Sequence, residues 1–401
     1  MMSESDHRRL GRELDLFHFQ EEAPGAVFWH PRGLELVRAL EAHLRRIVLR
    51  DGYREVRTPQ VLARSVWQAS GHWDSFRAGM MPLAPDDERE ATLKPVSCPG
   101  HVQIALDAQP SHRDLPLRYA ELGVVHRKEP SGVLHGLFRL RQFTQDDGHV
   151  LCAPAQVHDE LVRVLARMQH LYAGFGFPEL DVALATRPDV RAGDDALWDR
   201  AEHELAEAAR AAGFSPRNKP GEGAFYGPKI ELGLRDRAGR AWQCGTVQLD
   251  YVMPERFGAS YVAADGRRAP LVMIHRALLG SVERFCGVLL EHHDGKLPGW
   301  LAPEAVRVLA VSGKQAAYAA SLADDLRARG VRAEADRKEA PLGGRIREAH
   351  AARVPFVLVV GAREEAASSV VLRGEGGAPD ELLAREEGLA RLASACAPPA
   401  P

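Results

Sequence analysis

The sequence predicts an α+β protein in two parts, a first domain of about 300 residues around an antiparallel β-sheet and then a small α/β domain. The 401 residues exceed the usual size of a single domain. In several stretches in the middle of the chain, apolar and polar residues alternate, and glycine-containing turns bound these stretches, as is typical of antiparallel strands. After a cluster of Pro and Gly at residues 295–305, strand patterns alternate with helix patterns. We therefore expect domains at residues 1–300 and 301–401.

Apolar residues at three- and four-residue spacing predict the helices of the first domain. The first of them, at residues 34–51, leads into a short strand that stops at Pro59. The other expected helices cover residues 155–174, 196–212 and 276–291. The expected strands cover residues 124–129, 138–151, 229–236 and 241–251.

The second domain alternates short apolar strands with helices, which is typical of a small α/β fold. Its expected strands cover residues 306–312, 331–336, 355–361 and 368–374. Its expected helices cover residues 315–329 and 343–352.

Charge and composition exclude several classes of protein. The 52 basic and 55 acidic residues give a net charge of −3, so a nucleic-acid partner would need a local basic face. No apolar run reaches the roughly 18–20 residues that cross a bilayer, so we expect no membrane partner. The five cysteines are scattered and form no CxxC pair, which favours free thiols in a reducing cytoplasm.

A dense set of polar residues lies on two adjoining strands of the predicted sheet. Residues two apart on a strand share a face, so Arg127 and Glu129 should point together. The same holds for Gln145, Asp147 and His149 on the next strand. Burying so many polar groups is costly without a use, although a solvated sheet face would also explain the pattern.

Two further patterns are weak evidence when taken alone. Arg284 follows a Gly-Ser pair at a helix start, where an arginine can hold phosphate or simply lie on the surface. Cys98, His149 and His275 offer sulfur and nitrogen donors that suit zinc and leave a fourth position open. Their separations match no compact zinc pattern, so a buried thiol and two ordinary histidines are the alternative.

Eight stretches, read in order over residues 6–300, carry a resemblance to a known family. They are DHRRLGRELDLFHFQEEAPG, SGHWDSF, KPVSCPGHVQI, RKEPSG, FTQDDGHV, GEGAFYGPKIE, RAWQCGTVQLDY and IHRALLGSVERF. This part closely resembles the catalytic core of the threonyl-tRNA synthetases, which are class II aminoacyl-tRNA synthetases. Residues 301–401 resemble the family's anticodon-binding domain more loosely. The resemblance implies a cytoplasmic homodimer that joins threonine to tRNA(Thr) with ATP and Mg²⁺.

The three class motifs imply roles for individual residues. YREVRTP resembles motif 1, which helps to form the dimer interface, HRKE resembles motif 2 and GSVERF resembles motif 3. By resemblance, Arg127 holds the α-phosphate and stabilises charge in the transition state, and Glu129 contacts the adenine. Arg139 reaches the γ-phosphate, while Phe143 and Arg284 sandwich the adenine ring.

The resemblance also gives the predicted zinc ligands a purpose. One zinc per subunit, held by Cys98, His149 and His275, would bind the amino group and hydroxyl of threonine, which valine cannot match. The other residues implied for the substrate pocket are Asp147 at the hydroxyl, Gln145 and Tyr226 around the ammonium, and Gln243 and Gln248 at the ribose and substrate end. His72 matches the family residue implicated in transfer to the ribose hydroxyl of tRNA.

Three departures from the family pattern keep alternatives open. The sequence starts close to the catalytic core, so we expect it to lack the N-terminal editing domains of bacterial members. Val96 stands where the family typically has Met, which either reshapes the pocket or is neutral. Residues 303–401 contain 14 basic and 14 acidic residues, which puts anticodon reading in doubt. One local basic face and ordinary surface charge are the two alternatives for Arg337, Lys338, Arg345, Arg347 and Arg373.

The neutral C-terminal balance favours a second hypothesis, a paralogue that activates threonine or a related hydroxy amino acid for a carrier protein or small molecule. A third hypothesis is a binding module without catalysis, which we expect to have lost the ATP-binding arginines and metal ligands. All of these residues are present, which argues against it.

Overall fold

The computed structural model describes residues 6–83, 90–235, 239–374 and 378–400. These residues divide into two compact units. One unit comprises Gln20–Ala26 and Leu44–Phe285, and the rest of the described chain forms the other. The fold is α+β, as predicted, with helices and strands in both units.

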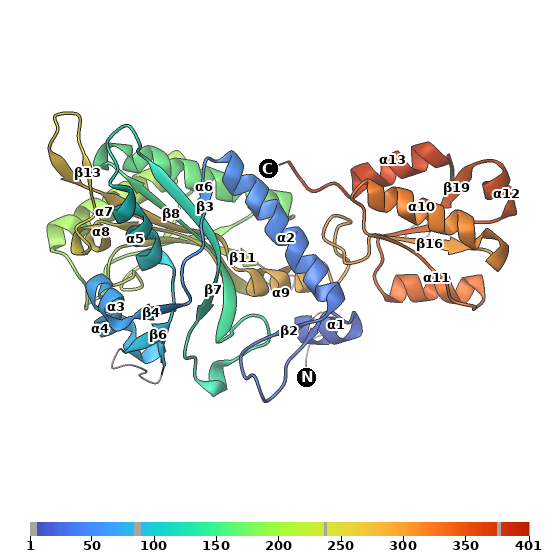
Figure 1. Ribbon diagram of the computed structural model, residues 1–401, viewed down its shortest axis with the longest axis horizontal. Coiled ribbons are helices and arrows are strands. Elements are labelled where there is room, and N and C mark those ends of the chain that lie inside the picture. Colours follow the sequence, from blue (N-terminus) through green and yellow to red (C-terminus); the bar gives the residue numbers. More distant parts are fainter. Residues whose placement is uncertain (1–5, 84–89, 236–238, 375–377, 401) are drawn as a thin grey trace. The chain divides into compact units, whose positions relative to one another are not determined.

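A mixed sheet of eight strands forms the centre of the first unit, counted over the described residues (Figure 1). Its strand order is β10-β9-β11-β12-β15-β8-β7-β3. Neighbouring strands are antiparallel except at the two edges, where β10 with β9 and β3 with β7 are parallel. The bounds in that order are Arg217–Lys219, Asp181–Ala185, Lys229–Arg235, Ala241–Asp250, Val272–Ser281, Gln142–Cys152, Leu117–His126 and Arg54–Glu55.

Helices cover both faces of this sheet. Helices α6 (Val157–Gly174) and α7 (Asp195–Ala211) pack on one face (Figure 1). Helix α5 (Cys98–Ala108) packs on the other, where Cys98 joins a cluster with Tyr119, the cross-strand neighbour of His149. Side chains alternate along each strand, so His149 lies on the α5 face.

Smaller elements surround the α5 face. Strands β4 (Val61–Ala63), β6 (Ala91–Leu93) and β5 (Met81–Pro82) form a small antiparallel sheet. The remaining elements of this unit are α3 (Arg64–Ser70), α4 (His72–Phe76), α8 (Val252–Arg256), β13 (Ser260–Val262) and β14 (Arg268–Pro270). Gly71 adopts a φ of 81° between α3 and α4, a left-handed conformation that glycine tolerates, and this turn places His72 at the start of α4.

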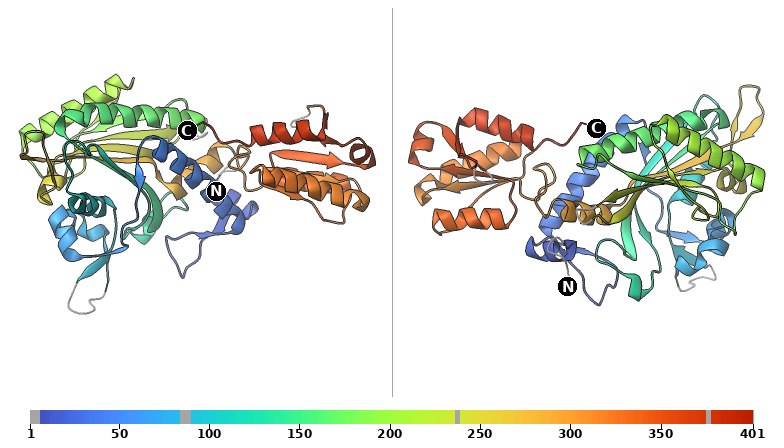
Figure 2. Two further views of the ribbon diagram at one scale, coloured as in Figure 1. Left: turned by 45° about the horizontal axis from the view of Figure 1, so that its top comes forward. Right: turned by 180° about the vertical axis from the view of Figure 1, so that it is seen from behind.

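The other unit contains a five-stranded sheet, counted over the described residues, with the order β17-β16-β18-β19-β20 (Figure 2). In that order the strands are Ala333–Ala335, Val306–Ala310, Phe356–Val360, Ser369–Leu372 and Glu381–Ala384. Helices α10 (Ala316–Ala328) and α13 (Arg385–Ala395) cover one face, and α11 (Leu342–Ala351) covers the other. The same unit contains α1 (His7–Glu13), β1 (Phe17–His18), β2 (Phe28–Trp29) and α12 (Ala362–Ala366).

Two helices continue from one unit into the other along the chain. Helix α2 (Pro31–Arg50) matches the helix expected at residues 34–51 and begins earlier, at a proline, which suits the first helical turn. Helix α9 spans Val282–His292. None of the helices in the described ranges combines the length and the hydrophobicity that crossing a bilayer requires.

Two local predictions were wrong. The helix expected at residues 276–291 starts only at Val282, because strand β15 continues to Ser281 and pairs with strands on both sides. Strand β15 is buried on both faces, so its residues form a continuous apolar run that resembles a buried helix in the sequence. Arg127 and Glu129 were expected on a strand, but β7 ends at His126 and both lie in the following loop.

Candidate active site

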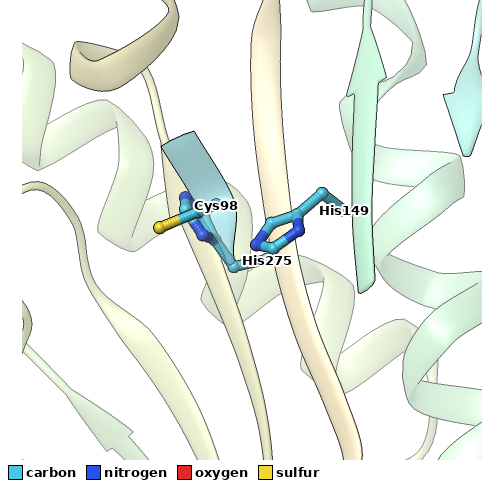
Figure 3. Close-up of side chains that lie close together, drawn as sticks. All are labelled: Cys98, His149 and His275. Carbon is cyan, nitrogen blue, oxygen red and sulfur yellow. The ribbon is translucent and has the colours of Figure 1, made fainter. Parts of the chain in front are cut away.

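The three predicted metal ligands come together from three elements of the first unit (Figure 3). Cys98 is the first residue of α5, and His149 on β8 and His275 on β15 are direct cross-strand partners. One donor atom of each lies within 4.8 Å of the other two, and all three side chains are buried. The donor set of one thiol and two imidazoles fits zinc and leaves a fourth position for a substrate.

Hydrogen bonds determine which ring nitrogens face the cluster. His149 Nδ1 lies 2.8 Å from His101 Nδ1, and His275 Nε2 lies 2.9 Å from Asp250 Oδ2. The nitrogens left for a metal are therefore Nε2 of His149 and Nδ1 of His275. Burial and the neighbouring His101 and His275 lower the pKa of His149, so its ring is neutral and able to ligate.

A cavity of about 380 Å³ opens beside this cluster. Its wall is polar and combines cations with aromatic rings. Eight predicted site residues line it: Arg127, Glu129, Arg139, Phe143, Gln145, Gln243, Gln248 and Arg284. They come from the loop after β7, from β8 and β12, and from the first turn of α9, so four regions of sequence form one pocket.

Two arginines of this wall are held in place by the backbone. Arg284 donates from Nε to the carbonyl of Phe138 and from Nη1 to the carbonyl of Gln243, both at 3.0 Å. Arg127 donates to the carbonyl of Pro95 at 3.1 Å and lies over the ring of Phe143, 5.1 Å from its centroid. These bonds orient the guanidinium groups before a ligand binds, which is the arrangement that stabilises developing negative charge.

The third arginine of the wall, Arg139, is exposed and forms an ion pair with Glu129. Its Nε and Nη2 atoms lie 3.0 and 2.9 Å from Glu129 Oε2. A ligand that takes either partner must break this pair, which costs little at an exposed position.

Hydrogen bonds and a ring contact join the residues between the cavity and the metal cluster. Tyr226 Oη donates to Gln248 Oε1 at 2.6 Å, and the Tyr226 ring lies 5.0 Å from that of His275. Arg127 Nη2 lies 3.4 Å from Gln145 Oε1. Asp147 is buried and accepts from the backbone N–H of Ser97 at 3.3 Å, and burial raises its pKa. Gln145 and Gln248 therefore lie in the cavity wall, while Tyr226 and Asp147 lie next to the histidines of the metal cluster.

His72 and Val96 border the same region. His72 is buried, and its Nε2 atom lies 4.0 Å from Cys98 Sγ. Burial, reinforced by the neighbouring His275, Arg127 and Arg256, lowers the pKa of His72 to about 3, so the ring is neutral at pH 7. Val96 packs partly buried between the cluster around Cys98 and that around Trp67.

Several residues of the site were missed by the sequence analysis. Lys229, Thr246 and Ser281 line the cavity, and among the described residues the buried Thr246 Oγ1 has no hydrogen-bond partner. Thr246 lies two residues before Gln248 on β12, so the two side chains share a face of the strand, and this alternation was the available signal.

A buried polar network beneath the metal cluster was also missed. Glu121 accepts hydrogen bonds from Lys94 Nζ, the backbone N–H of Thr58 and the ring of His101. Burial alone would raise the pKa of Glu121, but bonds from His101, Lys94 and Thr58 outweigh it and lower the pKa to about 2. Glu121 is therefore a carboxylate at neutral pH.

Comparisons with known proteins agree with this architecture. Residues 82–293 match the tRNA synthetase class II core domain (G, H, P, S and T), and residues 305–393 match an anticodon binding domain. Threonine–tRNA ligases of Polynucleobacter asymbioticus and Granulibacter bethesdensis are 48% and 50% identical to the chain. Each match covers 98% of the chain and 62% of the relative, so the chain spans less than two thirds of these relatives.

A solved structure extends the similarity to the fold. The crystal structure of the RNA binding domain of threonyl-tRNA synthetase from Cryptosporidium parvum has 38% identity and a TM-score of 0.95. The match covers 98% of this chain and 99% of the other.

The fold and the motif arginines around one cavity are those of a class II aminoacyl-tRNA synthetase. Relatives at about half identity over nearly the whole chain are threonine–tRNA ligases. The chain belongs to the threonyl-tRNA synthetase family.

Proposed function

We propose that this protein is a threonine–tRNA ligase, which activates threonine with ATP to threonyl-adenylate and transfers it to the 3′ end of tRNA(Thr). The supporting observation is the cavity lined by Arg127, Arg284 and Phe143 beside a cluster of one cysteine and two histidines. Adenylate formation is an in-line attack of the amino-acid carboxylate on the α-phosphorus, and it depends on positioned cations and Mg²⁺. The wall of this cavity supplies such cations.

In this proposal ATP occupies the cavity with its Mg²⁺. Arg127 holds the α-phosphate and Arg139 the γ-phosphate, after Arg139 leaves its ion pair with Glu129. Glu129 then accepts from the adenine amino group, and Phe143 and Arg284 stack on the two faces of the ring. Gln243 lines the ribose end.

Threonine lies between the cavity and the proposed zinc, one per subunit, held by Cys98, His149 and His275. The metal would supply a Lewis acid that binds the amino group and the hydroxyl of the substrate. The residues proposed around threonine are Asp147 at the hydroxyl, Gln145 and Tyr226 at the ammonium, and Gln248 and Val96 in the wall. Shape alone rejects valine by about two orders of magnitude, and ligation of the hydroxyl adds to this.

Transfer requires a further group and a further domain. The neutral ring of His72 is proposed to take a proton from the terminal ribose hydroxyl of tRNA. Residues 301–401 are proposed as the anticodon domain, and residues 1–300 as the catalytic domain. We further propose a homodimer in the cytoplasm, with motif 1 around β3 at the subunit interface.

One observation favours a different acceptor. Three of the basic residues available for an anticodon face are engaged within the C-terminal domain. Lys338 pairs with Glu348, Arg373 pairs with Asp380, and Arg345 is buried with its guanidinium on the carbonyl of Ala310. A chain that activates threonine for a carrier protein would not need those cations.

Two assays run together distinguish these candidates. Threonine-dependent ATP–pyrophosphate exchange reports activation, and charging of a tRNA(Thr) transcript reports transfer. We expect both exchange and charging. Valine should support exchange at least 100-fold less well than threonine, because shape alone already gives about that discrimination. Exchange without charging would exclude the tRNA ligase and favour the other acceptor, and no exchange would exclude both.

A further inference from the structure

A chain of four buried side chains leads from β6 to the metal cluster. Lys94 Nζ lies 2.9 Å from Glu121 Oε1, and Glu121 Oε2 lies 3.2 Å from His101 Nε2. His101 Nδ1 then lies 2.8 Å from Nδ1 of His149. The exposed fractions of Lys94, Glu121, His101 and His149 are 0%, 4%, 0% and 1%. Burying two charges and two rings is costly, so this arrangement needs an explanation beyond packing.

We propose that Lys94, Glu121 and His101 form a relay that fixes the tautomer of His149, so that Nε2 of His149 presents a lone pair to the metal. The inference rests on the metal site of the proposed function. His101 is a positioning residue, since it acts through His149 and contacts no substrate group.

Donors and acceptors along the chain allow one assignment of protons for a neutral His101. Lys94 and Thr58 donate to Glu121, and Thr58 Oγ1 in turn accepts from Lys94 at 2.9 Å. The carboxylate can only accept, so Nε2 of His101 carries its proton. Nδ1 of His101 is then an acceptor, and the proton between the two rings belongs to Nδ1 of His149. Nε2 of His149 is left unprotonated.

The second histidine ligand shows the simpler alternative. His275 Nε2 meets the carboxylate of Asp250 directly, and Asp250 Oδ1 also accepts from the backbone N–H groups of Val252 and Met253. In both ligands the proton lies on the ring nitrogen that faces away from the cluster. This nitrogen is Nδ1 in His149 and Nε2 in His275. On the His149 side a second histidine, His101, lies between the carboxylate of Glu121 and the ring of the ligand.

The first test measures zinc affinity rather than activity. Apo protein is titrated with Zn²⁺ in competition with a chromophoric chelator. We expect His101→Leu to bind zinc about 10- to 100-fold more weakly than the wild type. His101→Asn should recover most of this loss, because its Oδ1 can take the place of Nδ1 as acceptor from His149.

A matched control separates the relay from general damage to the core. Glu160 on α6 is as buried as Glu121 and pairs with Arg118, which lies on β7 as Glu121 does. Unlike Glu121, Glu160 lies on the α6 face of the sheet. We expect Glu160→Gln to lower thermal stability and leave the zinc affinity within about twofold of the wild type, since surroundings of the metal are unchanged. An equal loss of affinity in Glu160→Gln and His101→Leu would overturn the relay.

A second test is made on the wild-type protein, so its result does not depend on whether a variant of the relay folds. Long-range ¹H–¹⁵N correlation spectra of the zinc-loaded wild type, labelled at histidine, report which ring nitrogen carries a proton, with His149→Gln used for assignment. We expect a proton on Nδ1 of His149, and a proton on Nε2 instead would overturn the proposal. A wild type that binds no zinc would contradict the metal site itself, whereas zinc binding with equal affinity in His101→Leu would contradict only the relay.

Discussion

The large sheet and the small C-terminal sheet differ in where their charged side chains lie, many of them buried in the first and most of them exposed in the second. On the α5 face of the large sheet, ionisable groups are buried and share hydrogen bonds, as Glu121 and Asp250 do with histidine rings. In the C-terminal domain many ion pairs lie at the surface, such as those of Arg327 with Asp324 and Arg391 with Glu381. Burial of charge is costly and surface pairing is nearly free, so the first arrangement marks a site under functional constraint.

The largest effect should come from breaking the buried side of this comparison. Arg127→Ala removes a preorganised donor from the cavity, and we expect threonine-dependent exchange to fall about 100- to 1,000-fold with no change in circular dichroism. Arg391→Ala is the control in the C-terminal sheet region, because Arg391 is exposed and pairs with the exposed Glu381. Exchange should stay within about twofold of the wild type in that variant. Comparable losses in both would refute the assignment of the cavity.

The same contrast explains what could be predicted from the sequence. Helix α2 was expected because its apolar spacing is local information, and β8 placed Gln145, Asp147 and His149 on one face through simple alternation. Strand β15 was missed, and its second half was assigned to a helix, because its state depends on pairing with β8 and β12, which are distant in sequence. Periodicity cannot report such partners.

The relay was missed for a related reason. Lys94 and Glu121 are 27 residues apart, and His101 and His149 are 48 apart. Each looks ordinary in its own segment. His101 follows Cys98 by one helical turn, so the two share a face of α5, but that spacing alone does not distinguish a packed histidine from one that supports a metal ligand.

A smaller effect concerns pH and a buried carboxyl group, that of Glu283, which accepts a hydrogen bond from Ser281 of the cavity wall. Burial raises the pKa of Glu283 from 4.5 to about 7, although bonds from the Thr144 N–H and Ser281 Oγ oppose the shift. Between pH 4.5 and 7 the folded protein therefore binds more protons than the unfolded chain, and the free energy of unfolding falls as pH rises. The expected fall is on the order of 3 kcal/mol.

Glu283→Gln should flatten this pH dependence, as measured by urea unfolding at several pH values. The C-terminal domain supplies the opposite case, because a hydrogen bond from Lys338 lowers the pKa of the exposed Glu348. Glu348→Gln should therefore leave the slope between pH 4.5 and 7 unchanged. A wild type whose stability is flat or rises over this range would show that Glu283 ionises normally.

The smallest expected effect would sharpen the comparison at the C-terminal surface. Arg337 and Arg347 are exposed and, among the described residues, have no ion-pair partner, so their charge is available to a phosphate backbone. If tRNA contacts this domain, Arg337→Ala with Arg347→Ala should weaken charging about 3- to 10-fold and reduce the salt slope of binding by about 2. ATP–pyrophosphate exchange should not change, because the cavity proposed for activation lies in the other unit. Arg373→Ala is the matched control, since Asp380 already neutralises that arginine and its loss should cost less. Equal, negligible effects in the double variant and the control would mean that this surface does not meet tRNA, and would favour the acceptor that is not tRNA.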